Sequence, residues 1–377
     1  MASRIGLQQL WLRVHRWIGL GLLPVFAALA LTGAVLVFPT FFDRLANPER
    51  YPDRASDTVA AASTLLREGA VRLPQGDRPS AIRYPEAGGA VMVAGQVSGP
   101  PNLGLGPPKR AKVWLDPADG AVLSTSDGRA DFLWSMHATH GHLLLKGVGR
   151  DLLAWIGVVL LVSAASGLWL WWPGLRHVGR ALRWQRRASI SLNLHRQSGA
   201  VIALILILET ITGIYVAAPA VFTSVIEPGA PARQMSEGPA ATLSLASPRL
   251  DIDAALQAAV TVVPEGRIAS IFLPTEKLAA WVVNFESEDG SRAVHVAEAD
   301  GRATLRPAPP PGPARRVESV MTDLHFGHYG VIWRWVVFLS GVAMSLLAIT
   351  GPLIWLQGRK RRAKRASAGA GASARAA

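Results

Sequence analysis

Two histidines, His15 and His195, lie 180 residues apart and have the same neighbours. Each is followed directly by Arg and, 17 positions after the histidine, by Thr-Gly. His140 and His325 form a second pair, at an offset of 185 residues. Matching segments at a nearly constant offset indicate an internal repeat of about 180 residues. Because neutral imidazole is the commonest metal ligand in proteins, the two pairs predict metal chemistry.

Composition places these histidines in a membrane protein. Half of the 377 residues are apolar and only 17% are charged, which is low for a soluble protein. Three uncharged stretches, and a fourth interrupted only by Glu209, are long enough to cross about 30 Å of hydrocarbon. They are residues 17–42, 152–175, 335–357 and 197–226. We therefore expect four transmembrane helices, the first of them too long for a cleaved signal peptide.

The net charge of +13 is concentrated beside these helices. Residues 1–16 hold three Arg, residues 173–197 hold six Arg, and residues 357–377 hold seven Lys or Arg, all without an acid. Such an excess marks the cytoplasmic side of membrane helices. It predicts a membrane protein with both termini in the cytoplasm, and it leaves no reason to expect a nucleic-acid partner. The absence of cysteine excludes disulfides, Cys-bound iron–sulfur clusters and covalent c-type haem.

This topology predicts the domain organisation. The segments are 1–42 (N-terminus and first helix), 43–135 (first periplasmic domain), 136–175 (second helix with an outer histidine cluster), 176–196 (basic cytoplasmic loop), 197–226 (third helix), 227–322 (second periplasmic domain), 323–357 (fourth helix) and 358–377 (basic disordered cytoplasmic tail). We expect a four-helix transmembrane bundle with two small α+β domains outside it.

Each outer domain is predicted to contain one helix followed by a three-stranded meander. The first has a helix at 58–68 and strands near 80–84, 90–96 and 112–115, ending at the turn Asp119-Gly120. The second has a helix at 252–262 and strands near 267–273, 280–286 and 293–297, ending at Asp300-Gly301. Alternating apolar residues bounded by turn residues support these strands.

The topology also sorts the histidines by membrane face. His15 and His195 begin helices at the cytoplasmic face, whereas His140 and His325 precede helices at the outer face. A parallel repeat brings His15 opposite His195 and His140 opposite His325. Each pair could bind one haem iron through two neutral imidazoles, which leaves no open coordination position and suits electron transfer. The predicted cofactor is two non-covalent haem b groups.

Several neighbouring residues keep more than one interpretation. Further histidines at the outer face are alternative ligands or substrate contacts: His137, His142 and His328. Arg16 and Arg196 could bind haem propionates, although the positive-inside bias also explains them. Glu209 is either a proton-coupling group or a packed neutral carboxylic acid. A Thr-Gly or Ser-Gly pair in each helix is expected to permit close helix packing, or to make room for a porphyrin.

Several short stretches match one membrane family. They are Val14-His15-Arg16-Trp17-Ile18-Gly19-Leu20, His140-Gly141-His142-Leu143-Leu144 with Gly149-Arg150, Ser166-Gly167-Leu168-Trp169-Leu170-Trp171-Trp172-Pro173, and Leu324-His325-Phe326-Gly327 with Thr350-Gly351. On these stretches the chain resembles the PepSY-associated transmembrane family up to the basic tail. The resemblance implies PepSY-like outer domains, an inner-membrane haem protein, and His15, His140, His195 and His325 in the family's four haem-ligand positions. Some members are ferric-siderophore reductases in iron uptake.

Functions from different classes follow. The leading one is a transmembrane electron carrier, a haem-dependent oxidoreductase that reduces a periplasmic acceptor, for which the resemblance suggests a ferric siderophore. No flavin or nicotinamide domain is fused, so the electron donor would be separate, either a quinol or a cytoplasmic flavoprotein. The alternative is a membrane-anchored PepSY module that binds and regulates a peptide or protease without redox activity. Metal transport through the outer histidines would need a polar path, which the helices lack apart from Glu209.

Overall fold

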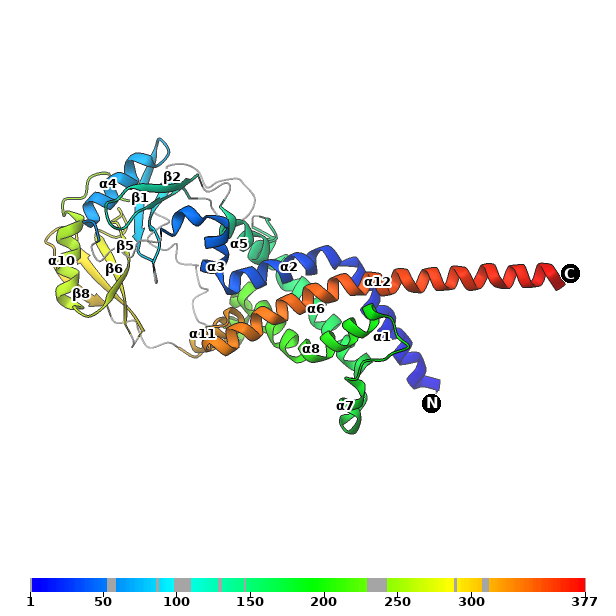
Figure 1. The fold of residues 1–377 in the computed structure, drawn as a ribbon. Coiled ribbons are helices and arrows are strands. Elements are labelled where there is room, and N and C mark those ends of the chain that lie inside the picture. Colours follow the sequence, from blue (N-terminus) through cyan, green and yellow to red (C-terminus); the bar gives the residue numbers. More distant parts are fainter. Residues whose placement is uncertain are drawn as a thin grey trace. The chain divides into compact units, whose positions relative to one another are not determined.

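The computed structural model describes residues 2–52, 59–85, 88–97, 110–127, 131–145, 147–228, 243–287, 290–306 and 312–376. The chain divides into two compact units, whose elements are labelled in Figure 1. The membrane unit comprises Met1–Phe38, Met136–Ile226 and Ala314–Ala377, and the sheet unit comprises Pro39–Ser135 and Glu227–Pro313. Each unit is therefore built from separate stretches of sequence.

Helices form the membrane unit. The longer ones are α1 (Ala2–Gly21), α2 (Leu23–Val37), α6 (Gly149–Trp171), α8 (Ile190–Ala217) and α12 (Gly330–Ala376), and the shorter ones are α5 (Phe132–His142), η2 (Leu175–His177), α7 (Val178–Ala181), α9 (Pro219–Ile226) and α11 (Pro313–Phe326). Among the described residues, α6, α8 and α12 are each long and apolar enough to cross a membrane. The pair α1 and α2 makes a fourth span if it is counted as one. The described chain therefore has three candidate membrane spans, or four with the bent pair.

Prolines divide two of the predicted spans. The first predicted helix, residues 17–42, is divided among α1, α2 and the start of the next helix at Pro39, and the axes of α1 and α2 differ by 69°. Pro24 is in the first turn of α2, where its missing N–H costs no hydrogen bond. Pro219 similarly ends α8 at Ala217, because the residue before a proline avoids the helical conformation. The predicted third span therefore ends before residue 226, and Pro219–Ile226 forms the separate helix α9.

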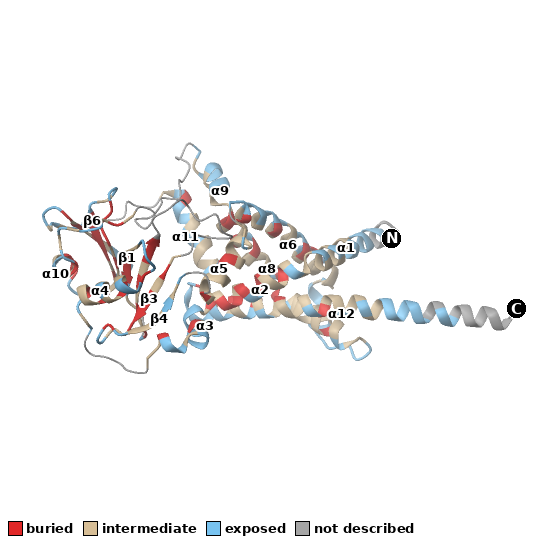
Figure 2. Ribbon diagram, turned by 90° about the horizontal axis from the view of Figure 1, so that it is seen from above, coloured by how far each residue is buried: buried red, intermediate tan, exposed pale blue. Residues whose placement is uncertain are grey.

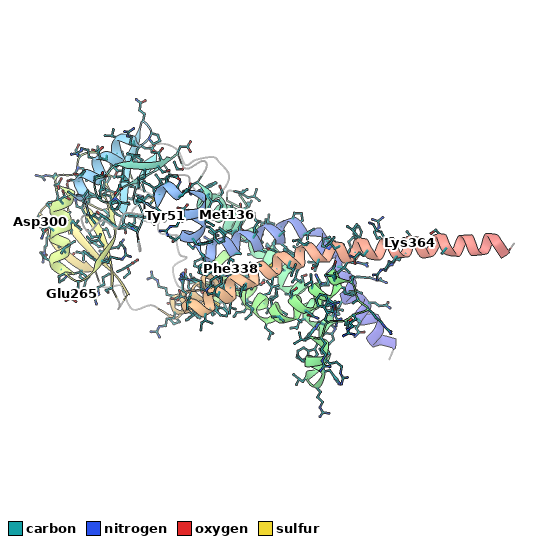
Figure 3. All side chains as sticks on the ribbon, viewed as in Figure 1. Tyr51, Met136, Glu265, Asp300, Phe338 and Lys364 are labelled. Atoms are coloured by element: carbon teal, nitrogen blue, oxygen red, sulfur yellow. The ribbon has the colours of Figure 1, made fainter. Side chains whose placement is uncertain are left out.

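The predicted disordered tail is instead the end of α12. This helix runs from Gly330 to Ala376, and its far part, around Lys364, extends beyond the other helices of the membrane unit in Figure 3. Alanine and the long straight side chains of Arg and Lys dominate this segment, and these residues have high intrinsic helix propensity. Local propensity therefore continues the helix where the charge run alone suggested disorder.

The spanning helices pack on one another around a small apolar core. Helix α6 contacts α1 and α8, and α12 contacts α2 and α8. The buried core residues come from four of these helices: Phe26, Leu29, Ala30, Ile156, Ile202 and Met344. Many other apolar side chains of the same helices are exposed, as expected for surfaces that face lipid. Figure 2 shows this distribution, with buried residues on only part of each helix.

The sheet unit contains one antiparallel sheet of eight strands in the order β4-β3-β2-β1-β5-β6-β7-β8. The strands are β1 (Asp77–Arg83), β2 (Val91–Val97), β3 (Lys112–Leu115), β4 (Val122–Ser126), β5 (Arg267–Phe272), β6 (Ala280–Ser287), β7 (Gly290–Ala297) and β8 (Ala303–Arg306). Strand β1 pairs with β5, with Ile82 opposite Ile271. The prediction of two separate α+β domains is therefore wrong. Each meander has an edge strand with unpaired backbone groups, and pairing β1 with β5 satisfies both edges.

Each half of the sheet also has a fourth strand that was not predicted. The turns at Asp119-Gly120 and Asp300-Gly301 lead into β4 and β8 instead of ending the meanders. Gly120 and Gly301 have φ of +78° and +71°, a conformation that favours glycine and allows the chain to reverse. Strands β4 and β8 are short and contain no buried residue, so apolar alternation gave little sign of them.

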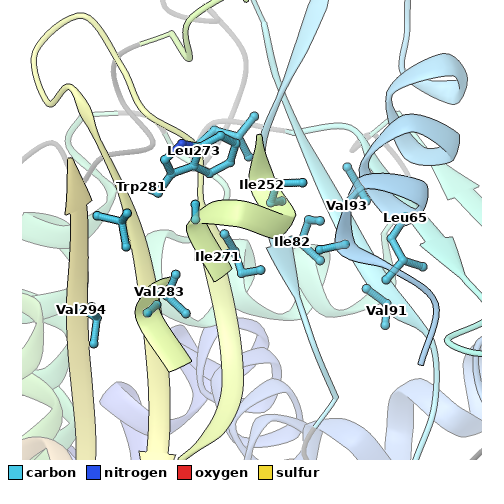
Figure 4. Close-up of a cluster of buried hydrophobic side chains, with 14 of the residues drawn as sticks. Leu65, Ile82, Val91, Val93, Ile252, Ile271, Leu273, Trp281, Val283 and Val294 are labelled. Atoms are coloured by element: carbon cyan, nitrogen blue, oxygen red, sulfur yellow. The ribbon is translucent and has the colours of Figure 1, made fainter. Parts of the chain in front are cut away.

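Two helices cover one face of the sheet. They are α4 (Ala62–Arg72), which begins four residues later than predicted, and α10 (Ile252–Val262), whose predicted bounds are confirmed. Alternate strand residues point toward them and form one continuous core, part of which is drawn in Figure 4: Leu65, Ile82, Val91, Val93, Ile252, Ile271, Trp281, Val283 and Val294. Because Ile82 and Ile271 belong to the same core, the two halves share their hydrophobic stabilisation.

A buried ion cluster ties together the chain segments at one side of the sheet unit. Asp43, at the end of α3 (Pro39–Ala46), accepts hydrogen bonds from the Arg50 guanidinium at 3.2 Å and the Tyr51 hydroxyl at 2.9 Å. Burial, followed by this bond to Asp43, raises the pKa of Tyr51. Arg50 also lies 3.9 Å from Asp131, which pairs with Lys112 of β3. The cluster connects α3 to the segment that precedes α5.

Two facing pairs of histidines

The membrane unit brings four histidines together as two facing pairs. The rings of His15 on α1 and His195 on α8 have centroids 6.2 Å apart and planes 77° apart. The rings of His140 on α5 and His325 on α11 have centroids 6.1 Å apart and planes 37° apart. These are the two pairings expected from the sequence offsets.

Each of the four imidazoles is held through Nδ1 by a neighbouring helix. The Nδ1 atom of His15 lies 3.0 Å from Ser163 O and 3.2 Å from Ser166 Oγ. That of His140 lies 3.0 Å from Leu29 O and 3.3 Å from Thr32 Oγ1. That of His195 lies 3.0 Å from Thr350 Oγ1, and the Leu347 backbone also bonds this histidine. That of His325 lies 3.1 Å from both Glu209 O and Thr212 Oγ1.

These contacts select one tautomer of each ring. A backbone carbonyl can only accept, so Nδ1 must carry the hydrogen. The serine or threonine hydroxyl donates its own proton within its helix, for example from Thr350 Oγ1 to Leu346 O at 2.8 Å, so it also accepts from Nδ1. In the neutral imidazole, Nε2 is then left unprotonated. All four rings are prepared to donate the Nε2 lone pair to a metal.

The glycine makes room for the same ring in three of the four Ser/Thr-Gly pairs, and in the fourth it lies at an ordinary contact distance from the ring. A Cβ atom on Gly33 would lie 2.7 Å from Cε1 of His140, and one on Gly167 would lie 2.9 Å from Cε1 of His15. The corresponding distances are 3.0 Å at Gly213 to His325 and 3.6 Å at Gly351 to His195. Helix packing and porphyrin space were the expected roles of these pairs. In the structure, each pair holds an imidazole.

Within each half of the chain, two helices exchange their histidines: each helix anchors the histidine that precedes or begins the other. The pair Ser166-Gly167 on α6 holds His15, and Thr32-Gly33 on α2 holds His140, which precedes α6. In the second half of the chain, α12 holds His195 and α8 holds His325. Each histidine is therefore anchored within its own half but faces a histidine of the other half. The two facing pairs connect the halves.

The spacing within each pair suits one metal ion between two rings. Because a metal lies about 2.0 Å from a bound imidazole nitrogen, two imidazoles on opposite sides of one metal have centroids roughly 6 Å apart. The described residues contain no group of three or more His, Cys, Asp or Glu side chains that could hold a metal ion. Within the described chain, each site thus offers two imidazoles as possible ligands.

Comparison with known proteins identifies the family. The sequence matches the family described as the PepSY-associated TM region over residues 12–358. The chain belongs to this family. No curated protein sequence matches it. The family assignment agrees with the resemblance carried by the histidine, Ser/Thr-Gly and Trp-Trp-Pro stretches.

Three further histidines of this PepSY-associated protein lie outside the facing pairs. His137 is exposed, and His142 is half-buried at the end of α5. His328 is 51% exposed, and its Nδ1 lies 3.2 Å from Asp323 Oδ1. His140 and His325 face each other and are anchored by Thr32 and Thr212, so the geometry favours these two as a ligand pair.

Two arginines border the His15–His195 pair in this PepSY-associated chain. The Nε atom of Arg16 is buried, and no described residue accepts a hydrogen bond from it. Its guanidinium carbon lies 5.5 Å from the centre of the neighbouring Trp17 ring. Arg196 is half-buried. A buried donor without an acceptor fits an anionic group beside the histidine pair, as a cofactor carboxylate would supply.

Proposed function

We propose that this protein is a di-haem b electron carrier of the bacterial inner membrane. One haem lies between His15 and His195 and the other between His140 and His325. One observation carries the proposal: the four imidazoles face each other in two pairs, and each is hydrogen-bonded through Nδ1. This bonding leaves Nε2 of each ring available to bind a metal. With only two protein ligands per site, the remaining coordination positions require a macrocycle such as a porphyrin.

The two sites would lie near opposite membrane faces. On α8, His195 belongs to one pair and Thr212 anchors the other. The 17 intervening steps of helix correspond to about 25 Å at 1.5 Å per residue, most of a hydrocarbon core of about 30 Å. The basic segments at both termini and at residues 173–197 favour the His15–His195 face as cytoplasmic.

The chain's own residues would keep the haem sites ready for electron transfer. Bound haem would supply a one-electron carrier, and ligation by both histidines of a pair would leave its iron no position for a substrate. The Ser/Thr-Gly pairs fix the ring orientation and tautomer, so little rearrangement accompanies a change of charge. Arg16 and Arg196 would balance the propionates of the cytoplasmic-side haem. We further propose a duplicated half as the origin of the two sites, packed as a four-helix bundle.

The acceptor class comes from family resemblance. A ferric siderophore holds iron through hard oxygen ligands, which bind the ferrous ion less tightly, so one-electron reduction would release the metal. The sheet unit would bind or shield this acceptor in the periplasm. Electrons would come from a separate donor, a quinol or a cytoplasmic flavoprotein, enter at His15–His195 and leave from His140–His325.

A haem-to-protein ratio tests this function. Purified full-length protein should contain two haem b groups per chain and give reduced-minus-oxidised bands of six-coordinate haem. His195→Ala and His325→Ala should each remove one haem. His295→Ala, on strand β7 of the sheet unit, is the matched control and should keep both. Absence of haem in the wild type, or equal spectra after replacing all four histidines, contradicts the proposal.

A further inference from the structure

Only one of the four anchoring sites contains an acid. In each site the backbone carbonyl that meets the histidine belongs to the residue three positions before the serine or threonine. These residues are Leu29, Ser163, Glu209 and Leu347. Three of the corresponding side chains are uncharged, and the fourth, beside His325, is a carboxylic acid. The two histidine pairs are therefore chemically different despite their common geometry.

The Glu209 side chain turns back toward the ring that its backbone already holds. Its Oε2 atom lies 3.4 Å from Nδ1 of His325, while its backbone oxygen lies 3.1 Å from the same atom. The two side chains are 11% and 17% exposed, so little solvent separates them. The other carboxyl oxygen, Oε1, is buried, and none of the described residues bonds it. Nothing else in the described structure accounts for this acid in a spanning helix.

A carboxyl group next to Nδ1–H changes the electron-donating strength of Nε2, the atom on the other side of the imidazole ring. It draws the Nδ1 hydrogen toward itself and makes Nε2 a stronger electron donor to a bound metal. Stronger donation stabilises ferric iron more than ferrous iron, because the ferric ion carries the greater positive charge. An uncharged leucine or serine side chain at the same position has no such effect.

We propose that Glu209 is a positioning residue that lowers the reduction potential of the haem at His140–His325 relative to the haem at His15–His195. The inference rests on the proposed function and deepens it. The lower potential makes the outer site the stronger reductant, which suits the site that must pass an electron to a tightly chelated ferric ion.

A single-haem background isolates the effect. In the full-length His195→Ala protein, the remaining haem is the one at His140–His325. Glu209→Leu, which copies Leu29 and Leu347, should raise its midpoint potential by about the 59 mV that corresponds to a tenfold change in the ratio of reduced to oxidised haem. Glu209→Gln keeps an oxygen near Nδ1 without the acid and should give a smaller rise.

The converse variant tests the rule at the other pair. In a His325→Ala background, Leu347→Glu places an acid at the equivalent position beside His195 and should lower the midpoint potential, whereas Leu347→Gln should change it little. Unchanged potentials in Glu209→Leu with haem retained overturn the inference. Loss of haem in both Glu209 variants also overturns it, in favour of a purely structural role. Absence of haem from the wild type contradicts the proposed function instead, so the two failures are distinguishable.

Discussion

Thr350 holds His195 through a hydroxyl group that both donates and accepts. Its Oγ1 lies 2.8 Å from Leu346 O within α12 and 3.0 Å from Nδ1 of His195 on α8. The proton of the hydroxyl is used inside the helix, so its lone pair faces the imidazole. This single side chain thereby joins two spanning helices and selects the tautomer whose Nε2 is free.

Removing the Thr350 hydroxyl should weaken cofactor retention at one site only. Thr350→Val keeps the shape of the side chain but removes the hydroxyl that lies 3.0 Å from Nδ1 of His195. Loss of a group that hydrogen-bonds a metal-binding histidine typically lowers the metal affinity roughly 10- to 100-fold. The measurement is the rate of haem transfer to an excess of apomyoglobin. Thr350→Ser should restore the wild-type rate, and an equally fast loss from Thr350→Ser contradicts the role of the hydroxyl.

The glycines of the anchoring pairs should differ in their tolerance to alanine. Gly33→Ala would place a methyl group 2.7 Å from Cε1 of His140, whereas Gly351→Ala would place one at an ordinary contact distance of 3.6 Å from His195. Overpacking of this kind costs about 1–3 kcal/mol and displaces the ring. We expect Gly33→Ala to bind about one haem per chain and Gly351→Ala to bind two, as measured by haem content. Equal haem content in the two variants would mean that ring position does not depend on the missing Cβ.

The pairing of the histidines could be predicted from sequence, but their anchoring could not. A constant offset and topology were sufficient to place His15 opposite His195. The Ser/Thr-Gly pairs were visible as a repeated motif, yet their partners depend on tertiary packing. Thr32 follows His15 by 17 residues on the same predicted helix but holds His140 instead. No local pattern indicates that exchange.

The sheet shows the same limit on what the sequence reveals. Apolar periodicity predicted three of the four strands in each half and the helix at 252–262, because these elements bury one face. The joining of β1 to β5 brings Ile82 and Ile271 together across 189 residues of sequence. Such an edge-to-edge pairing has no local signal. The bend before Pro24 was missed because the uncharged run continues through it.

A disulfide should link the two halves of the sheet. Ala81 and Phe272 are directly opposite on β1 and β5, and opposed residues of antiparallel strands have Cα atoms about 4.5–5.5 Å apart, within the range of a disulfide. The chain has no cysteine, so Ala81→Cys with Phe272→Cys introduces a single possible bridge. Oxidation followed by cleavage at a protease site inserted in the loop between α6 and α8 should leave the fragments joined. The control pair, Ala81→Cys with Leu305→Cys on the edge strand β8, should not form a disulfide. If the two halves were separate domains, neither cysteine pair would form a disulfide, and the fragments would separate.

Loss of the Asp131 charge should destabilise the sheet unit strongly. Its side chain is 2% exposed and lies between Arg50, 3.9 Å away, and Lys112. Asp131→Asn preserves the size but leaves two cations without this carboxylate, and removing one partner of a buried pair costs about 3–5 kcal/mol. Glu68→Gln is the matched control, because its pair with Arg67 at 3.3 Å is 43% and 67% exposed and such surface pairs contribute about 0–1 kcal/mol. Thermal unfolding of the full-length protein can be monitored by the susceptibility of the sheet unit to proteolysis. The unfolding temperature should fall strongly for Asp131→Asn and change little for Glu68→Gln. Similar unfolding temperatures for the two variants would show that the buried cluster does not hold α3 to the segment before α5.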